Sequence, residues 1–148
     1  MTYPLHEPRI WDWALRMADT VSELSKDPST KVGAVIFDKN RRLISAGYNG
    51  LPRGVKDSSE RLYDRETKLK MTLHAEMNAV SFATAPLEGS TLICTHPCCT
   101  QCTALLIQVG VAHVCWPRPD ARFLERWKPD IILSKQMFDE AGVAIHER

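Results

Sequence analysis

The sequence predicts a three-layer α/β/α fold, in which helices cover both faces of a central mixed sheet of about five strands. Segments with helical periodicity alternate with segments typical of strands along the chain. The first two strand segments are separated only by a short polar turn, as in a hairpin, so the sheet is expected to be mixed rather than wholly parallel. Residues 89–117 carry no charged side chain, which is typical of the buried centre of a domain.

The chain begins with a helix followed by a β-hairpin. Residues 9–25 place apolar side chains at helical spacing, and Asp27-Pro28 ends this helix. Residues 31–37 and 42–48 are rich in apolar and β-branched residues, and they flank a polar turn at residues 38–42. This pattern predicts two antiparallel strands.

A loop and a charged segment follow the hairpin. Residues 49–54 contain two glycines and a proline and predict a loop. Residues 55–72 are highly charged and are expected to be partly helical around residues 59–71, with the mixed charges typical of a solvated helix face. Residues 74–83 again predict a helix.

The second half of the chain alternates strands and helices. Residues 99–109 predict a helix. Pro129 suits the first turn of a helix that runs to about residue 141, where Gly142 ends it. Strands are expected at residues 92–95, 112–116 and 143–146.

The length and charge of the chain restrict its architecture and its partners. With 148 residues and 16.7 kDa, we expect one domain over residues 1–148. Lys and Arg number 19 against 18 Asp and Glu, so the net charge is +1. This balance argues against binding a polynucleotide or an anionic membrane by bulk charge attraction. The longest uncharged stretch is interrupted by Thr, His, Pro, Gln and Gly and does not resemble a membrane span.

The cysteines indicate a reducing compartment. Their number is odd, and the N-terminus has no basic segment followed by an apolar one, so neither a disulfide framework nor a secretory signal is expected. Reduced thiols in the cytoplasm, some of them on a metal, fit better. The cysteines are Cys94, Cys98, Cys99, Cys102 and Cys115.

One group of residues has the composition of a catalytic zinc site. Cys99 and Cys102 have the C-x-x-C spacing that lets two thiolates bind one metal, and His74 is the third candidate ligand. Three protein ligands leave a tetrahedral position open for water, as in catalytic rather than structural zinc sites. Glu76 is the candidate proton shuttle. Since residues two apart in mid-helix point about 200° apart, His74 and Glu76 serve one site only if the helix begins at this point.

The assignment of the first thiolate leaves an alternative. Pro97 is followed by two cysteines, and pairing Cys98 with Cys102 would give C-x₃-C. Pairing Cys99 with Cys102 keeps the C-x-x-C step, so we assign Cys99 as the ligand.

The zinc deaminases have a His-x-Glu and Pro-Cys-x-x-Cys pattern, which this chain follows except that Cys98 stands where the family has the proline before the first cysteine ligand. The chain resembles the cytidine and deoxycytidylate deaminase family, and most of all its deoxycytidylate (dCMP) branch, which the Gly-Tyr-Asn-Gly loop and the charged segment before His74 favour. The resemblance covers most of the chain. The matching stretches are residues 27–36, 47–54, 74–79, 99–102 and 106–108.

The resemblance implies a fold, a reaction and a set of site residues. The fold is the cytidine-deaminase-like α/β/α sandwich, and the reaction is hydrolytic deamination of dCMP to dUMP and ammonia, which supplies dUMP for dTMP synthesis. One Zn²⁺ per chain activates water, while Glu76 carries the proton to N3 of the ring and then to the departing amine. The substrate contacts implied are Asn49 for the sugar, the Ala75 backbone for the pyrimidine edge, and Ser29 and Lys31 for the 5′-phosphate.

The resemblance also implies partners. These are a homo-oligomer, a hexamer being one size, and dCTP or dTTP as effectors, with Mg²⁺ beside an allosteric nucleotide. Two other functions stay open at this point. One is deamination of another cytosine nucleoside, of a free base or of adenosine in tRNA, and the other is a zinc-stabilised binding module without catalysis.

Overall fold

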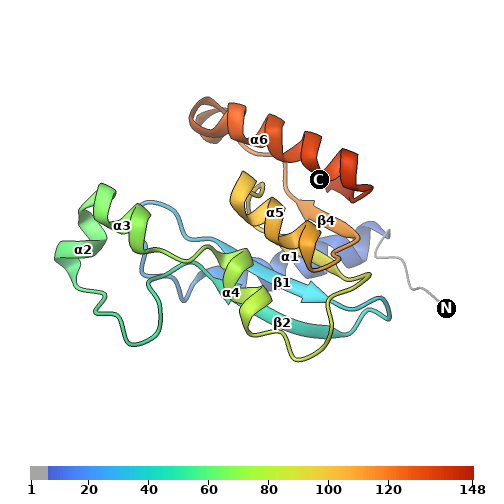
Figure 1. The fold of residues 1–148 in the computed structure, drawn as a ribbon, viewed down its shortest axis with the longest axis horizontal. Helices are drawn as coiled ribbons and strands as arrows, with labels where there is room; N and C mark the ends of the chain where they lie inside the picture. The colour runs from blue at the N-terminus through green and yellow to red at the C-terminus, as the bar shows by residue number, and fades with distance from the viewer. Residues whose placement is uncertain (1–6) are drawn as a thin grey trace.

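The computed structural model describes residues 7–148. The prediction that the N-terminus lacks a secretory signal falls partly on residues 1–6, which lie outside the described residues. Helices and strands alternate as expected from the sequence (Figure 1). The helices are α1 (Pro8–Ser22), α2 (Ser59–Tyr63), α3 (Arg65–Met71), α4 (Ala75–Ser81), α5 (Thr100–Gln108) and α6 (Ala121–Ala141). The strands are β1 (Gly33–Phe37), β2 (Leu43–Tyr48), β3 (Thr91–Cys94), β4 (His113–Trp116) and β5 (Ala144–Glu147).

The strands form one mixed sheet in the order β2-β1-β3-β4-β5. β1 pairs antiparallel with β2, as the hairpin predicted, and also antiparallel with β3. β3, β4 and β5 are parallel to one another, because a helix crosses over between each strand and the next. The expectation of a mixed, five-stranded sheet with helices on both faces is confirmed.

The two faces of the sheet carry separate hydrophobic clusters. Successive residues of β1 point to opposite faces. Val35 and Phe37 pack with the apolar side of α1, whereas Ala34 and Ile36 pack with α4, α5 and α6. The helices that carry the predicted zinc ligands therefore lie on the second face. Among residues 7–148, no helix is long and apolar enough to cross a membrane.

Two glycines let helices approach the sheet closely. A Cβ at Gly33 would lie 2.0 Å from the carbonyl oxygen of Ala18 on α1, and one at Gly47 would lie 2.6 Å from the carbonyl oxygen of Ala75 on α4. A side chain at Gly47 would push α4 away from β2. Gly47 thus sets the position of the helix that carries Glu76.

The start of α6 differs from the prediction. The helix begins at Ala121 rather than at Pro129, with Asp120 as its N-cap, so Pro129 lies inside it. A proline in a helix interior removes one backbone hydrogen bond but does not always end the helix. The first half of α6, residues 121–128, contains none of the buried residues of this helix, whereas the second half packs on the core through Ile131 and Phe138.

Candidate active site

The residues of the predicted zinc site meet where two helices begin. His74 is the N-cap of α4, and Glu76 lies in the first turn. Cys99 is the N-cap of α5, and Cys102 follows in its first turn. The helix start at position 74 confirms the condition under which His74 and Glu76 serve one site. Both helices also direct the positive ends of their dipoles toward this region.

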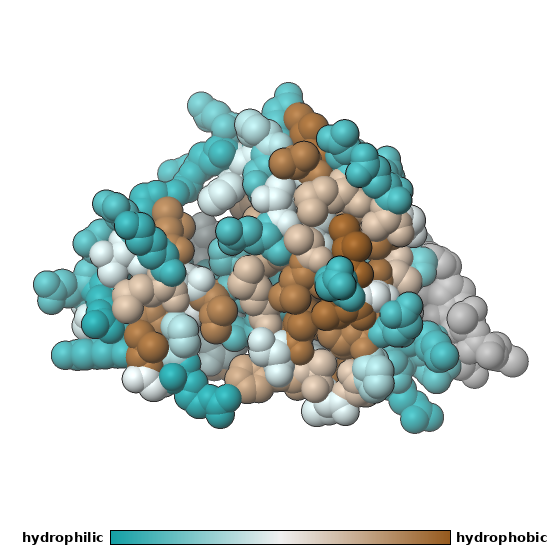
Figure 2. Space-filling view, in the orientation of Figure 1, coloured by the Kyte–Doolittle hydropathy of each residue, from teal (hydrophilic) through white to brown (hydrophobic). Residues whose placement is uncertain are grey.

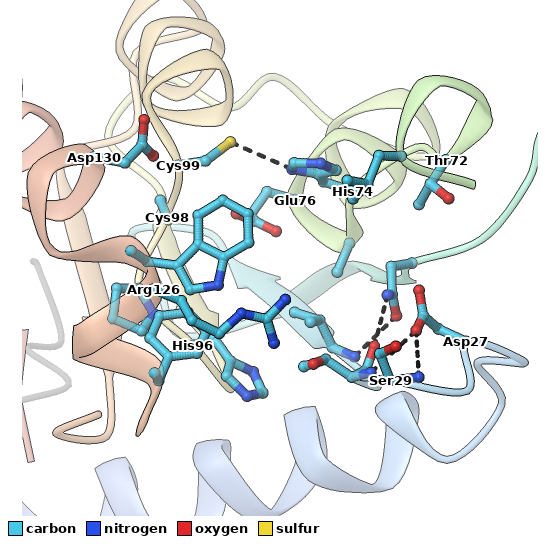
Figure 3. A pocket seen from close by; sticks show the side chains of 18 of the residues that line it. Asp27, Ser29, Thr72, His74, Glu76, His96, Cys98, Cys99, Arg126 and Asp130 are labelled. Atoms are coloured by element: carbon cyan, nitrogen blue, oxygen red, sulfur yellow. Dashed lines mark hydrogen bonds between the residues drawn. The ribbon is translucent and has the colours of Figure 1, made fainter. Parts of the chain in front are cut away.

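Three ligand atoms converge in the geometry that zinc requires. The Nδ1 atom of His74 lies 3.3 Å from the Sγ atom of Cys99 and 3.3 Å from that of Cys102. The ligand atoms all lie within 4.8 Å of one another. Tetrahedral zinc with bonds of about 2.0 Å to nitrogen and 2.3 Å to sulfur holds these atoms about 3.5 Å apart. The side chains therefore fit a zinc ion bound by one imidazole and two thiolates. Figure 3 shows His74 and Cys99 pointing toward each other.

The two remaining cysteines near the site are buried thiols. Cys94 on β3 and Cys98 are fully buried, and burial raises the pKa of both well above the ordinary value. Neither belongs to the cluster of ligand atoms. This supports Cys99, rather than Cys98, as the partner of Cys102.

The charge states of the cluster suit metal binding. The hydrogen bond with the Cys102 thiol lowers the pKa of Cys99 to about 4, and the hydrogen bond with His74 acts in the same direction. The same hydrogen bond with Cys99 raises the pKa of Cys102, and the contact with Cys99 raises that of His74. Cys99 is thus a thiolate before any cation arrives, and a cation attracts the second thiolate by the same electrostatics.

Glu76 is placed to hold a proton rather than to bind the metal. Its side chain is 4% exposed and lines the same pocket as His74 and Cys99. Burial raises the pKa of its carboxyl above the ordinary value. A carboxyl in this position can accept a proton and return it.

The pocket above this cluster is walled by segments distant in sequence. One wall consists of residues 27–32 and α3, with Arg65, Lys68 and Thr72. The opposite wall is the first half of α6, which contributes Phe123, Arg126 and Trp127. In Figure 3 the side chain of Arg126 extends from α6 toward Ser29.

Lys68 is a buried cation that holds α3 against the body. Its ammonium group donates to Asp27 Oδ1 at 3.1 Å and to Ser29 Oγ at 3.2 Å, and the side chains of Lys68 and Asp27 are 5% and 10% exposed. Asp27 also accepts from the backbone N–H groups of Ser29 and Thr30. The charged segment before His74 is therefore not wholly a solvated face.

The predicted substrate contacts have different surroundings. Asn49 is buried and lines the pocket, but its side chain accepts from the Val32 N–H and donates to the Thr30 carbonyl. Ser29 and Ala75 line the pocket as well. Lys31 is exposed and is not among the lining residues.

Sequence reasoning did not single out the pocket residues of α3 and α6. Arg126 and Trp127 precede Pro129, in a stretch for which the sequence predicts no helix or strand, and Lys68 lies in a segment expected to be solvated. His96 lines the pocket, and its Nδ1 lies 2.8 Å from Thr95 Oγ1. Burial lowers the pKa of His96.

Comparisons with known proteins agree with this geometry. Residues 9–117 match the family described as the cytidine and deoxycytidylate deaminase zinc-binding region. A protein of Aliivibrio fischeri named "Uncharacterized deaminase in luxG 3'region" is 47% identical over 136 residues, which are 90% of this chain and 91% of that protein. A "Probable deoxycytidylate deaminase" of Drosophila melanogaster is 35% identical over 80% of this chain. This chain spans 62% of that relative's length.

A solved structure shares the fold over almost the whole chain. The dCMP deaminase of cyanophage S-TIM5, in complex with dCMP and dUMP, superposes with a TM-score of 0.75 at 25% identity. The alignment covers 96% of this chain and 98% of that structure.

Proposed function

Since the chain belongs to the cytidine and deoxycytidylate deaminase family, we propose that it hydrolyses dCMP to dUMP and ammonia, acting as a single zinc-dependent deaminase domain over residues 1–148. The observation that carries this proposal is the meeting of His74, Cys99 and Cys102 beside a pocket that is lined by the buried residue Glu76. The dCMP deaminase named among the similar structures supports the choice of substrate.

The proposed ligands of zinc are His74, Cys99 and Cys102. Zinc in such a site supplies Lewis acidity that makes water nucleophilic near neutral pH. Glu76 accepts the proton of the attacking water and delivers it to N3 of the cytosine ring, while oxygen bonds to C4. Glu76 then moves the second proton of that water to the amine at C4, which leaves as ammonia. The raised pKa of the Glu76 carboxyl suits both transfers.

The base and the sugar are assigned to the inner part of the pocket. We propose that the Ala75 N–H binds the pyrimidine edge, because the first amides of a helix lack intrahelical acceptors. Asn49 is assigned to the sugar. Its amide retains one N–H beyond the bond to Thr30, and its carbonyl retains one lone pair beyond the bond from Val32.

The 5′-phosphate is assigned to the outer, basic part of the pocket. We propose that Arg126 and Ser29 contact it from opposite walls. Within residues 7–148 Arg126 forms no ion pair, whereas the charge of Lys68 is balanced by Asp27. Arg126 can therefore offer a full positive charge and a bidentate donor. Arg126 lines the pocket and Lys31 does not, which supports Arg126 over Lys31 as the main cation.

A nucleotide panel tests the proposed function. Ammonia release is measured with dCMP, CMP, dCTP, deoxycytidine and cytosine, with zinc content determined on the same preparation. We expect one zinc per chain and the highest kcat/KM for dCMP. Preference for deoxycytidine or cytosine would overturn the nucleotide assignment. A zinc-loaded protein without activity toward any of them would favour a binding module.

Self-association and regulation form a separate part of the proposal. We propose a homo-oligomer, with a hexamer as the expected size, and dCTP or dTTP with Mg²⁺ as effectors. Exposed apolar side chains on α4 and β2 support self-association, since Phe82 is 54% and Leu43 is 49% exposed. Figure 2 shows hydrophobic residues gathered near the middle of this face, surrounded by hydrophilic ones. Light scattering measures the size, and the panel with and without dCTP, dTTP and Mg²⁺ measures regulation.

A further inference from the structure

Asp130 joins the zinc-binding helix to the pocket wall. It lies on α6, and its carboxylate faces the start of α5 (Figure 3). Oδ2 accepts from the backbone N–H of Thr100 at 3.0 Å, and Oδ1 accepts from the Thr100 hydroxyl at 3.1 Å. Within residues 7–148, these are the only hydrogen bonds between α5 and α6.

In the described part of the chain, the next turn of each helix has no corresponding hydrogen bond between α5 and α6. Thr103 lies one turn after Thr100, and Ser134 lies one turn after Asp130. The hydroxyl oxygens of Thr103 and Ser134 are both buried and have no hydrogen-bond partner within the described residues. The polar connection between α5 and α6 is thus concentrated at the end nearest the zinc ligands.

Thr100 lies within the turn between the proposed zinc ligands Cys99 and Cys102, so its contact with Asp130 acts on that turn. Thr100 directly follows Cys99 and is the first residue of α5, so its N–H has no acceptor within the helix. The N–H of Cys102 is directed to Cys99 Sγ at 3.4 Å. The Asp130 carboxylate therefore holds the Cys99–Thr100 peptide, which lies between the two thiolates. Its negative charge also interacts favourably with the positive end of the α5 dipole.

We infer that Asp130 is a positioning residue for the zinc centre, which holds the Cys99–Cys102 turn in its ligating geometry and fixes the α6 wall to it. The inference rests on the proposed function, because it requires zinc at this site. Groups that orient metal ligands from outside the coordination shell typically change metal affinity by about 10–100-fold when they are removed. Asp130 acts through the Thr100 peptide and touches neither the metal nor the substrate in this role.

The test is the rate of zinc release to a chromogenic chelator from the zinc-loaded enzyme. Asp130→Ala removes both acceptors, and we expect release about 10–100-fold faster than in the wild type. Asp130→Asn retains one carbonyl acceptor for the Thr100 N–H, and its amide can donate to the Thr100 hydroxyl. We expect this conservative variant to restore most of the slow release. Asp139→Ala, an exposed carboxylate on the same helix, is the control and should release zinc like the wild type.

A gentler variant keeps the test decisive if Asp130→Ala does not fold. Thr100→Val removes the hydroxyl contact and leaves the backbone N–H in place, so a smaller acceleration, of about 3–10-fold, is expected. Release at the wild-type rate in Thr100→Val, or in a folded Asp130→Ala, would overturn the inference and leave the proposed function intact. A wild-type protein that binds no zinc would instead overturn the proposed function itself.

Discussion

The floor of the pocket, formed by the starts of α4 and α5, and its walls, formed by α3 and the first half of α6, are held by different forces. On the floor, Ala75, Ala79, Cys102 and Leu106 are fully buried in one hydrophobic cluster against the sheet. In the walls, Lys68 is the one buried residue of α3, and α6 has none before Ile131. The α3 wall is instead attached to the body by the Lys68–Asp27 ion pair. The α6 wall is attached by the contact of Phe123 with His96 and, just beyond it, by the hydrogen bonds of Asp130 with Thr100.

This contrast separates two kinds of requirement. The proposed chemistry needs atoms fixed to within a few tenths of an ångström, which close packing supplies because it is non-directional and continuous. Substrate entry needs a wall that is positioned but not buried, and a small number of hydrogen bonds supplies that. We therefore expect floor substitutions to abolish chemistry, and wall substitutions to change stability or substrate preference.

Replacement of Cys99 should have the largest effect. We expect Cys99→Ser to lose zinc and all measurable deamination, because a hydroxyl is a poor replacement for a thiolate on zinc. Cys98→Ala is the matched variant next to it in the chain and should keep one zinc per chain. Metal content after dialysis against a chelator measures both, and zinc loss confined to the Cys98 variant would reverse the ligand assignment.

Removal of the proposed proton shuttle should follow in size. Glu76→Gln preserves shape but cannot accept a proton, so kcat for dCMP is expected to fall by about 10²–10⁴-fold while zinc is retained. Glu140→Gln, on the exposed side of α6, should behave as wild type. Activity near wild type in a zinc-loaded Glu76→Gln variant would remove Glu76 from the mechanism.

Loss of the Lys68–Asp27 ion pair of the α3 wall should reduce the stability of the fold rather than the rate of the reaction. Lys68→Met leaves Asp27 buried without its cation, and such changes reduce the free energy of unfolding by about 3–5 kcal/mol. We expect a loss at the lower end of this range, because two backbone N–H groups still donate to Asp27. Urea denaturation measures the loss. Lys70→Met, which breaks an exposed pair with Glu66, is the control and should change little.

The α6 wall should determine substrate preference. Arg126→Gln removes the proposed charge-assisted contact with phosphate, which is worth about 1.5–3 kcal/mol. We expect kcat/KM to fall by about 10–100-fold for dCMP and to stay unchanged for deoxycytidine. Arg122→Gln, an exposed arginine on the same helix that does not line the pocket, should leave both values unchanged. Equal losses for the two substrates would contradict a phosphate contact.

The smallest effect is expected at the ion pair between Lys135 on α6 and Glu147 on β5. Burial acts to raise the pKa of Glu147, but hydrogen bonds from Lys135 and Trp116 bring it below the ordinary value of 4.5. A carboxyl with a lower pKa in the folded state stabilises the protein above its unfolded pKa. That stabilisation is lost as the pH falls through the folded pKa. Because this pair is partly exposed, Glu147→Gln should reduce stability at pH 7 by less than about 1 kcal/mol.

Thermal unfolding at pH 7 and pH 3 measures this contribution. The difference between wild type and Glu147→Gln should shrink at the lower pH, because protonation removes the charge of Glu147 that Gln also lacks. A difference that grows at low pH would contradict the lowered pKa.

The prediction of α6 shows where local patterns are insufficient. Pro129 predicts a helix start from its own chemistry, and residues 117–128 contain few apolar positions with helical spacing. The helix nevertheless starts at Ala121, where Asp120 caps it by accepting from the Phe123 N–H, and its first half covers the pocket. Phe123, Trp127 and His96 lie together there, with ring centroids 5.2 Å apart for His96–Phe123 and 6.2 Å for Phe123–Trp127. The contact of His96 with Phe123 joins two segments that no local pattern relates.

The sequence by itself determined the mixed sheet and the hairpin, because strand and helix periodicities are local. The spacing of the thiolates indicated the proposed ligand set, because that spacing follows from metal chemistry. The start of α4 at His74 could also be expected, since only that start brings His74 and Glu76 together. The tertiary structure alone decided the walls. Lys68 meets Asp27 across 41 residues, and Thr100 meets Asp130 across 30. Such contacts depend on how the elements pack, and a single surface-like lysine or aspartate does not reveal its partner until the chain has folded.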